Sequence, residues 1–126
     1  MEKILVVDDE KDVLVLLKDF FQARSYEVVT ASNGKDALKT FDAESPDIIL
    51  CDIKMPVMDG FEFLKELRTT RKWTPVIMIS ALNEHLNVMK AYEFEADYYI
   101  SKPLNLETTL RAVQIMSSLK ALRVKK

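Results

Sequence analysis

Short, continuously apolar runs alternate along the chain with stretches in which apolar residues recur every third or fourth position. The runs are rich in β-branched and aromatic residues, which is typical of strands buried on both faces. They cover residues 4–7, 28–29, 48–50, 76–79 and 98–100. The pattern therefore predicts five strands.

The stretches between the runs have a helical period. Their apolar stripes consist of Val13, Leu16, Leu17, Phe20 and Phe21; Ala37, Leu38 and Phe41; Phe61, Leu64 and Leu67; and Leu106, Leu110, Val113 and Met116. The weakest predicted helix covers residues 86–94. Residues that favour helix starts or turns stand at the joins, and these are Asn33, Ser45, Pro46, Asp59, Gly60, Thr74, Pro75 and Asn105.

Strand and helix thus alternate about five times, with connections of only a few residues. Such alternation favours right-handed βαβ units and an open parallel sheet with helices on both faces. The length of 126 residues suits one compact domain whose core needs no disulfide or metal. The predicted fold class is therefore α/β.

Charge and composition narrow the function classes. The net charge is −2, from 18 basic and 20 acidic residues spread along the chain, so no strong field favours nucleic acid or an anionic membrane. The sole cysteine, Cys51, cannot form an internal disulfide, and no apolar run reaches the roughly 18 residues of a membrane span. We expect a cytoplasmic protein without direct binding to DNA or membranes.

Polar side chains follow four of the predicted strands: Asp8 and Asp9 the first, Asp52 the third, Ser80 the fourth and Lys102 the fifth. They should converge, because ligands bind beyond the carboxyl ends of the strands in open α/β sheets. Clustered carboxylates repel unless a cation neutralises them, and Mg²⁺ prefers such oxygen ligands. A carboxylate beside Mg²⁺ can attack phosphorus, with an ammonium offsetting charge and a hydroxyl contacting a phosphoryl oxygen.

Each of these residues has a plainer interpretation when taken alone. Asp8 and Asp9 could belong to a helix N-cap region, Asp52 to a turn, and Lys102 to the solvated surface. Ser80 could cap the following helix. Only their joint order along the chain favours a common site.

The polar residues belong to short motifs that occur in a fixed order. The motifs are Val7-Asp8-Asp9-Glu10, Asp52-Ile53-Lys54-Met55-Pro56 with Met58-Asp59-Gly60, Ser80-Ala81 and Lys102-Pro103. In this order they resemble the response-regulator receiver family over nearly the whole chain. The resemblance implies a flavodoxin-like (βα)5 fold with strand order 2-1-3-4-5. It also implies a receiver domain over residues 1–121, followed by a basic tail or the start of a linker over residues 122–126.

The resemblance assigns a role to each matching position near the metal. Asp52 matches the phosphoacceptor, Asp9 the principal carboxylate ligand of Mg²⁺, and Asp8 its partner. Lys54 would contribute its backbone carbonyl to the cation.

The remaining matches concern the phosphoryl group and the switch. Lys102 matches the phosphate-contacting lysine, and Pro103 the family's usual cis peptide. Ser80 matches the switch hydroxyl, and Tyr99 the switch aromatic that moves inward when this hydroxyl is drawn toward phosphate. A strand aromatic that simply packs on the sheet is the alternative for Tyr99.

The resemblance also implies partners. The phosphoryl donor would be a histidine kinase or a histidine phosphotransfer protein. The face formed by the fourth helix, fifth strand and fifth helix would contact a downstream protein or a fused effector domain, and a phosphorylation-dependent homodimer is a further option. The chain would be a signalling domain and not an enzyme, since it catalyses only its own phosphorylation and dephosphorylation.

Three positions bear on how closely the chain follows the family. Glu95 stands where receivers commonly carry glycine, and a left-handed residue other than glycine costs roughly 1 kcal/mol. We therefore expect the fourth helix to end differently or to fray. Lys54 and Leu82 occupy positions that tune phosphate lifetime, and they favour slow autodephosphorylation.

Other functions remain open at this stage. An aspartate-nucleophile phosphatase would need a second acid two residues after its nucleophile, where Lys54 stands. A flavin or nucleotide binder would need a Gly- or Ser/Thr-rich loop after the first strand, where Asp8, Asp9 and Glu10 would repel phosphate. A receiver-like interaction module without phosphate turnover is the third alternative.

Overall fold

The computed structural model describes residues 1–70, 74–81, 89–90, 92–93 and 95–124. Every predicted apolar run lies within a strand. The elements are β1 (Lys3–Val7), α1 (Lys11–Gln22), β2 (Glu27–Ala31), α2 (Gly34–Glu44), β3 (Ile48–Asp52), α3 (Gly60–Thr70), β4 (Val76–Ser80), β5 (Tyr98–Ser101) and α5 (Leu106–Val124). Of the weak helix predicted over residues 86–94, residues 89–90 and 92–93 are helical, and the others lie outside the described residues.

The strands form one parallel sheet in the order β2-β1-β3-β4-β5, which confirms the predicted strand order. Neighbouring strands are in register at their carboxyl ends. Val7 pairs with Cys51, Asp52 with Ile79, and Ser80 with Ser101. The residues that follow β1, β3, β4 and β5 therefore meet at one edge of the sheet.

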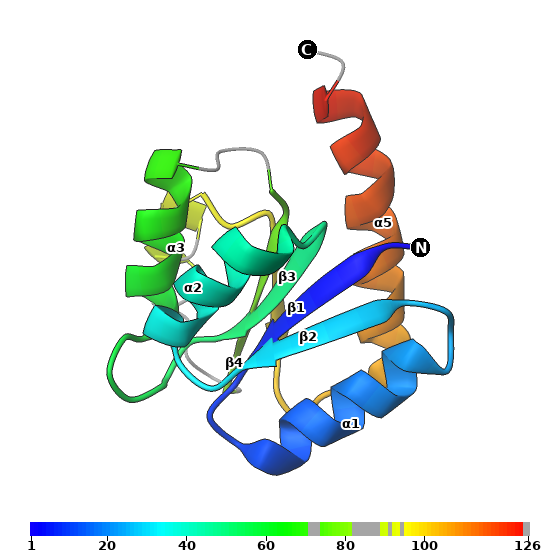
Figure 1. Ribbon diagram of the computed structural model, residues 1–126, viewed down its shortest axis with the longest axis horizontal. Helices are drawn as coiled ribbons and strands as arrows, with labels where there is room; N and C mark the ends of the chain where they lie inside the picture. Colours follow the sequence, from blue (N-terminus) through cyan, green and yellow to red (C-terminus); the bar gives the residue numbers. More distant parts are fainter. Residues whose placement is uncertain (71–73, 82–88, 91, 94, 125–126) are drawn as a thin grey trace.

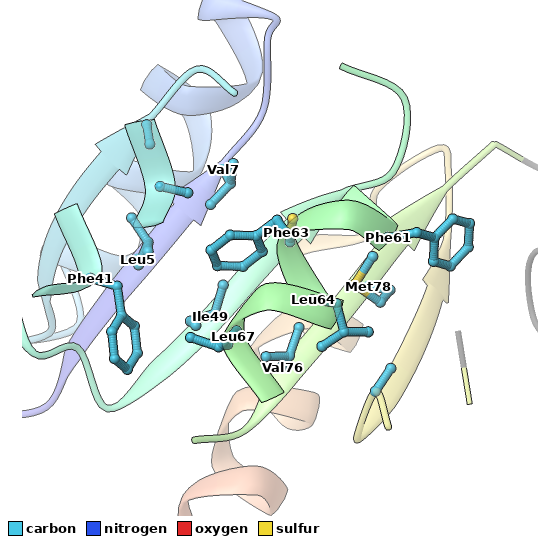
Figure 2. Close-up of a cluster of buried hydrophobic side chains, with 14 of the residues drawn as sticks. Leu5, Val7, Phe41, Ile49, Phe61, Phe63, Leu64, Leu67, Val76 and Met78 are labelled. Atoms are coloured by element: carbon cyan, nitrogen blue, oxygen red, sulfur yellow. The ribbon is translucent and has the colours of Figure 1, made fainter. Parts of the chain in front are cut away.

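The sheet separates two apolar layers, with α1 and α5 on one face and α2 and α3 on the other (Figure 1). Successive strand side chains point to opposite faces. Along β1, Leu5 and Val7 therefore join the layer of α2 and α3, whereas Ile4 and Val6 join the layer of α1 and α5. Figure 2 shows the layer of α2 and α3, in which Phe63 of α3 packs close to the strands. Burial on both faces explains why the strands read as continuous apolar runs.

Side-chain caps begin three helices at residues that the sequence marked as joins. Asn33 accepts a hydrogen bond from the Asp36 N–H at 2.9 Å, and Asn105 accepts one from the Thr108 N–H at 2.9 Å. At α3, Asp59 accepts from the Glu62 N–H while the Glu62 carboxylate accepts from the Asp59 N–H, which is a capping box.

The loop between β3 and α3 is held by its backbone. Val57 has φ 69°, and the Met58 N–H donates to the Pro56 carbonyl at 2.7 Å across it, as in a γ-turn. The Gly60 N–H then donates to the Ile53 carbonyl at 2.8 Å. The chain is thereby returned to the end of β3, directly beside Asp52.

Glu95 corrects one expectation. It has φ 67°, so the chain makes the left-handed turn that glycine usually makes, in spite of the side chain. The Glu95 N–H donates to the Tyr92 carbonyl at 3.0 Å, and the Glu95 carbonyl accepts from Arg68 Nε at 2.9 Å. These hydrogen bonds hold the Glu95 backbone in the conformation that glycine usually adopts, and the expected fraying falls partly on residues 91 and 94, which lie outside the described residues.

The last helix, α5, continues to Val124, so residues 122–124 of the predicted basic tail extend it. Within the described ranges, no helix combines the length and the apolar character that crossing a bilayer requires.

Candidate functional site

The predicted site residues meet at the carboxyl edge of the sheet. Three carboxylate oxygens, one each from Asp8, Asp9 and Asp52, lie within 4.8 Å of one another. Asp8 and Asp52 are buried and Asp9 is exposed. Such a group of hard oxygen donors at the edge of a cavity fits a cation such as Mg²⁺, which keeps several waters.

A cavity of about 310 Å³ opens over this cluster. It is lined by Asp9, Glu10, Asp52, Lys54, Ser80, Ala81 and Lys102. Lys54 thus borders the site as expected, and its predicted carbonyl contact with a cation stays a prediction. Leu82, the other residue expected to tune phosphate lifetime, lies outside the described residues.

The first two aspartates directly precede the N-cap of α1, and neither of them is the cap residue itself. The N-cap of α1 is Glu10, and it makes no side-chain capping bond. Asp8 accepts the Glu10 N–H at 2.9 Å, and its N–H donates to the Ala31 carbonyl at 3.1 Å. Asp8 is therefore fixed at the end of β1, with a carboxylate oxygen close to those of Asp9 and Asp52.

Lys102 places its ammonium among the carboxylates. Nζ is 3.6 Å from Asp8 Oδ2 and 3.6 Å from Asp52 Oδ1. The Lys102 N–H donates to the Ser80 carbonyl at 2.6 Å, and the peptide bond to Pro103 is cis, as the resemblance implies. Lys102 therefore supplies the positive charge that the buried carboxylates lack.

The close approach of these groups shifts their pKa values. Burial first, and then repulsion by Asp8, raises the pKa of Asp52 from 3.8 to about 6, against the opposing effects of Lys102 and the Ile53 N–H. Burial likewise raises the pKa of Asp8. Burial lowers the pKa of Lys102, but attraction by Asp52, Asp8 and Glu10 outweighs it and raises the pKa overall. The site holds more negative charge than the protein alone neutralises, which favours a divalent cation.

Replacing Asp52 by asparagine should stabilise the metal-free protein by about 2 kcal/mol at neutral pH. The raised pKa means that the folded state binds this proton more tightly than the unfolded chain, so stability falls as the pH rises from 3.8 to about 6. Each pKa unit corresponds to about 1.4 kcal/mol, reduced here by solvent in the open cavity. Urea unfolding at several pH values tests this, because the gain should largely vanish near pH 4. A gain independent of pH would contradict the assignment to this carboxyl group.

Tyr99 packs its ring against the layer of α2 and α3, while its hydroxyl is buried and finds no hydrogen-bond partner among the described residues. An unsatisfied buried hydroxyl costs about 1–3 kcal/mol. Tyr99→Phe should therefore raise the free energy of unfolding by about 1 kcal/mol, as measured by urea denaturation. Tyr98→Phe, on a more exposed neighbour, should change it much less. Destabilisation by Tyr99→Phe would indicate that the hydroxyl has a partner in solution.

Two neighbours of the site carried no predicted role. Glu10 lines the cavity and pairs with Lys102 at 3.5 Å, although the sequence marked it only as part of the first motif. Gly60 has so little space that a Cβ atom there would lie 2.3 Å from the Asp52 carbonyl oxygen. The motif position of Gly60 hinted at its importance, but the contact itself appears only in the fold.

Comparison with known proteins agrees with this geometry. Residues 4–114 match the family described as the response regulator receiver domain. The chain belongs to the response regulator receiver family. Among solved structures, a CheY-like receiver domain protein from Methanospirillum hungatei JF-1 superposes with a TM-score of 0.92 at 28% identity, over 98% of both chains. The chemotaxis protein CheY4 of Vibrio cholerae has a TM-score of 0.87 at 34% identity, over 92% of this chain and 98% of that one.

Among curated relatives, the alkaline phosphatase synthesis transcriptional regulatory protein PhoP of Bacillus subtilis (strain 168) is 39% identical over 104 residues, 82% of this chain and 43% of PhoP. The transcriptional regulatory protein CpxR of Escherichia coli (strain K12) is 39% identical over 116 residues, 90% of this chain and 49% of CpxR. The chain therefore spans less than half the length of each of these two relatives.

Proposed function

We propose that this receiver accepts a phosphoryl group on Asp52 in a Mg²⁺-dependent reaction. The observation that carries the proposal is the single cluster of Asp8, Asp9 and Asp52, with the Lys102 ammonium 3.6 Å from two of the three carboxylates. Bound Mg²⁺ would offset negative charge on the phosphoryl oxygens. Asp8, Asp9 and Asp52, with the backbone carbonyl of Lys54, would hold it.

Each side chain then has a defined task. A carboxylate oxygen of Asp52 forms the new bond to phosphorus, the bond from phosphorus to the donor breaks, and the donor leaves with that bonding pair. Lys102 contacts a phosphoryl oxygen. Ser80, buried beside the cavity, donates its hydroxyl to another oxygen, and Tyr99 responds to this movement as the switch aromatic.

The donor in the cell would be a histidine kinase or a histidine phosphotransfer protein, in the cytoplasm. The output would pass through the face of the fourth helix, β5 and α5 to a downstream protein or a fused effector domain. PhoP and CpxR support fusion to an effector domain, because both are named transcriptional regulatory proteins and the match to this chain covers only 43% of PhoP and 49% of CpxR. Exposed apolar side chains on these elements support the choice of face, and these are Met89 and Tyr92 before β5, Tyr98 on β5, and Ile115 and Leu119 on α5. The proposal takes residues 1–121 as the receiver domain. It also includes a homodimer that this domain forms when it is phosphorylated.

Intact-mass measurement tests the reaction. The wild type incubated with acetyl phosphate and Mg²⁺ should gain one phosphoryl group, and omission of Mg²⁺ or the change Asp52→Ala should prevent the gain. Wild type that gains nothing would contradict the proposal and favour an interaction module without phosphate turnover. Phosphate on Asp52→Ala would place the acceptor elsewhere.

A further inference from the structure

Lys102 stands almost equally far from three carboxylates. Its Nζ is 3.6 Å from Asp8 Oδ2, 3.6 Å from Asp52 Oδ1 and 3.5 Å from Glu10 Oε1. Asp8 and Asp52 are buried members of the cluster that fits a cation, whereas the Glu10 side chain is 64% exposed and lies outside that cluster. The ammonium therefore has two partners inside the cluster and one beside it.

We propose that Glu10 is a positioning residue, which draws Lys102 away from Asp8 and Asp52 when a divalent cation binds there and thereby strengthens cation binding. The inference rests on the proposed function. A cation bound by these two carboxylates would neutralise their negative charge and would repel the Lys102 ammonium. Glu10 is then the carboxylate that still balances the lysine.

The backbone presents Glu10 for this task. The residue is extended, with φ −89° and ψ 114°, at the N-cap of α1, and its N–H is tied to Asp8 Oδ1 at 2.9 Å. Its carboxylate makes no capping bond to the helix. The side chain is largely solvated, so pairing with Lys102 requires little desolvation.

The size of the effect follows from the exposure of the pair. Interactions between exposed charges are weak, and their usual range corresponds to a change of about two- to fivefold in a binding constant. Glu10 also attracts a cation directly through its charge. The two contributions are separable, because only the one acting through the ammonium disappears when Lys102 is removed.

A double-mutant cycle tests the proposal. The probe is Mg²⁺ alone, titrated at constant ionic strength into wild type, Glu10→Gln, Lys102→Met and the double variant, and followed by amide NMR shifts. Glu10→Gln should weaken Mg²⁺ binding about two- to fivefold in the wild-type background and much less in the Lys102→Met background. Lys102→Met alone should tighten binding. Asp12→Asn, which removes an exposed charge from the first turn of the same helix, is the matched control and should have a smaller effect than Glu10→Gln.

Several results would overturn the inference. An equal loss from Glu10→Gln in both backgrounds would assign the whole effect to direct attraction of the cation, and no loss in either would leave Glu10 without a role. A loss from Asp12→Asn as large as that from Glu10→Gln would point to general charge. If the wild type binds no Mg²⁺, that result would instead contradict the Mg²⁺ dependence in the proposed function. Thermal melts of all variants verify that each one is folded.

Discussion

Replacing Arg68 by methionine should lower the free energy of unfolding by about 3–5 kcal/mol, because it removes the guanidinium that pairs with a buried carboxylate. Arg68 Nη2 lies 2.7 Å from Asp97 Oδ2, and both side chains are only 6% exposed. The same guanidinium donates to the Thr74 carbonyl at 2.6 Å and to the Glu95 carbonyl at 2.9 Å. One side chain near the end of α3 thus fastens the start of β4 and the turn into β5.

Urea denaturation measures this loss of stability. Two further variants serve as controls for it. Lys3→Met removes a cation that pairs with Glu27 and Glu44 at the surface, and its effect should be far smaller. Replacing Arg68 and Asp97 together by apolar residues should recover part of the stability, since neither charge then remains alone. A loss from Arg68→Met no larger than that from Lys3→Met would show that the buried pair contributes little.

Gly60→Ala should also be strongly destabilising, by about 3 kcal/mol, and should slow phosphorylation of Asp52 by acetyl phosphate. A Cβ atom at this position would lie 2.3 Å from the Asp52 carbonyl oxygen and 2.9 Å from the Ile53 Cα atom. Both neighbours are backbone atoms, so the clash is relieved only by shifting the end of β3 that carries the proposed acceptor, Asp52. Helix propensity by itself predicts the opposite sign, because alanine is normally favoured over glycine in a helix by about 1 kcal/mol.

The opposite signs make this a sharp test. Urea unfolding and the intact-mass assay should both respond to Gly60→Ala. Thr69→Ala, at an exposed position near the other end of α3, should leave the phosphorylation rate unchanged and alter stability only slightly. A stabilised Gly60→Ala variant with normal phosphorylation would mean that the loop after β3 can move away at little cost.

Much of the fold was readable from local patterns. The continuous apolar runs at residues 4–7 and 76–79 identified buried strands, because a parallel strand covered on both faces must be apolar at every position. Asn33 and Asn105 marked helix starts by the capping bonds that their side chains form. The polar residues after the strands indicated the site, because parallel strands bring their carboxyl ends to one edge of the sheet.

Other features depend on distances that only the folded chain sets. The pairing of Arg68 with Asp97 joins residues 29 positions apart, and neither position has a local signature of burial as an ion. Arg68 also donates a hydrogen bond to the carbonyl of Glu95, which makes a left-handed turn where the sequence indicated a departure. A prediction from local pattern places such charged side chains in solvent, because charged side chains are usually at the surface.

The sequence by itself determined the class of fold, the strand order through family resemblance, and the set of groups at the site. The tertiary structure decided how these groups act on one another: the near-equal distances from Lys102 to three carboxylates, the raised pKa of Asp52 and the buried hydroxyl of Tyr99. The physical reason is that periodicity and capping arise between near neighbours in the chain. Electrostatic and steric effects instead vary over ångströms between residues that the sequence keeps far apart.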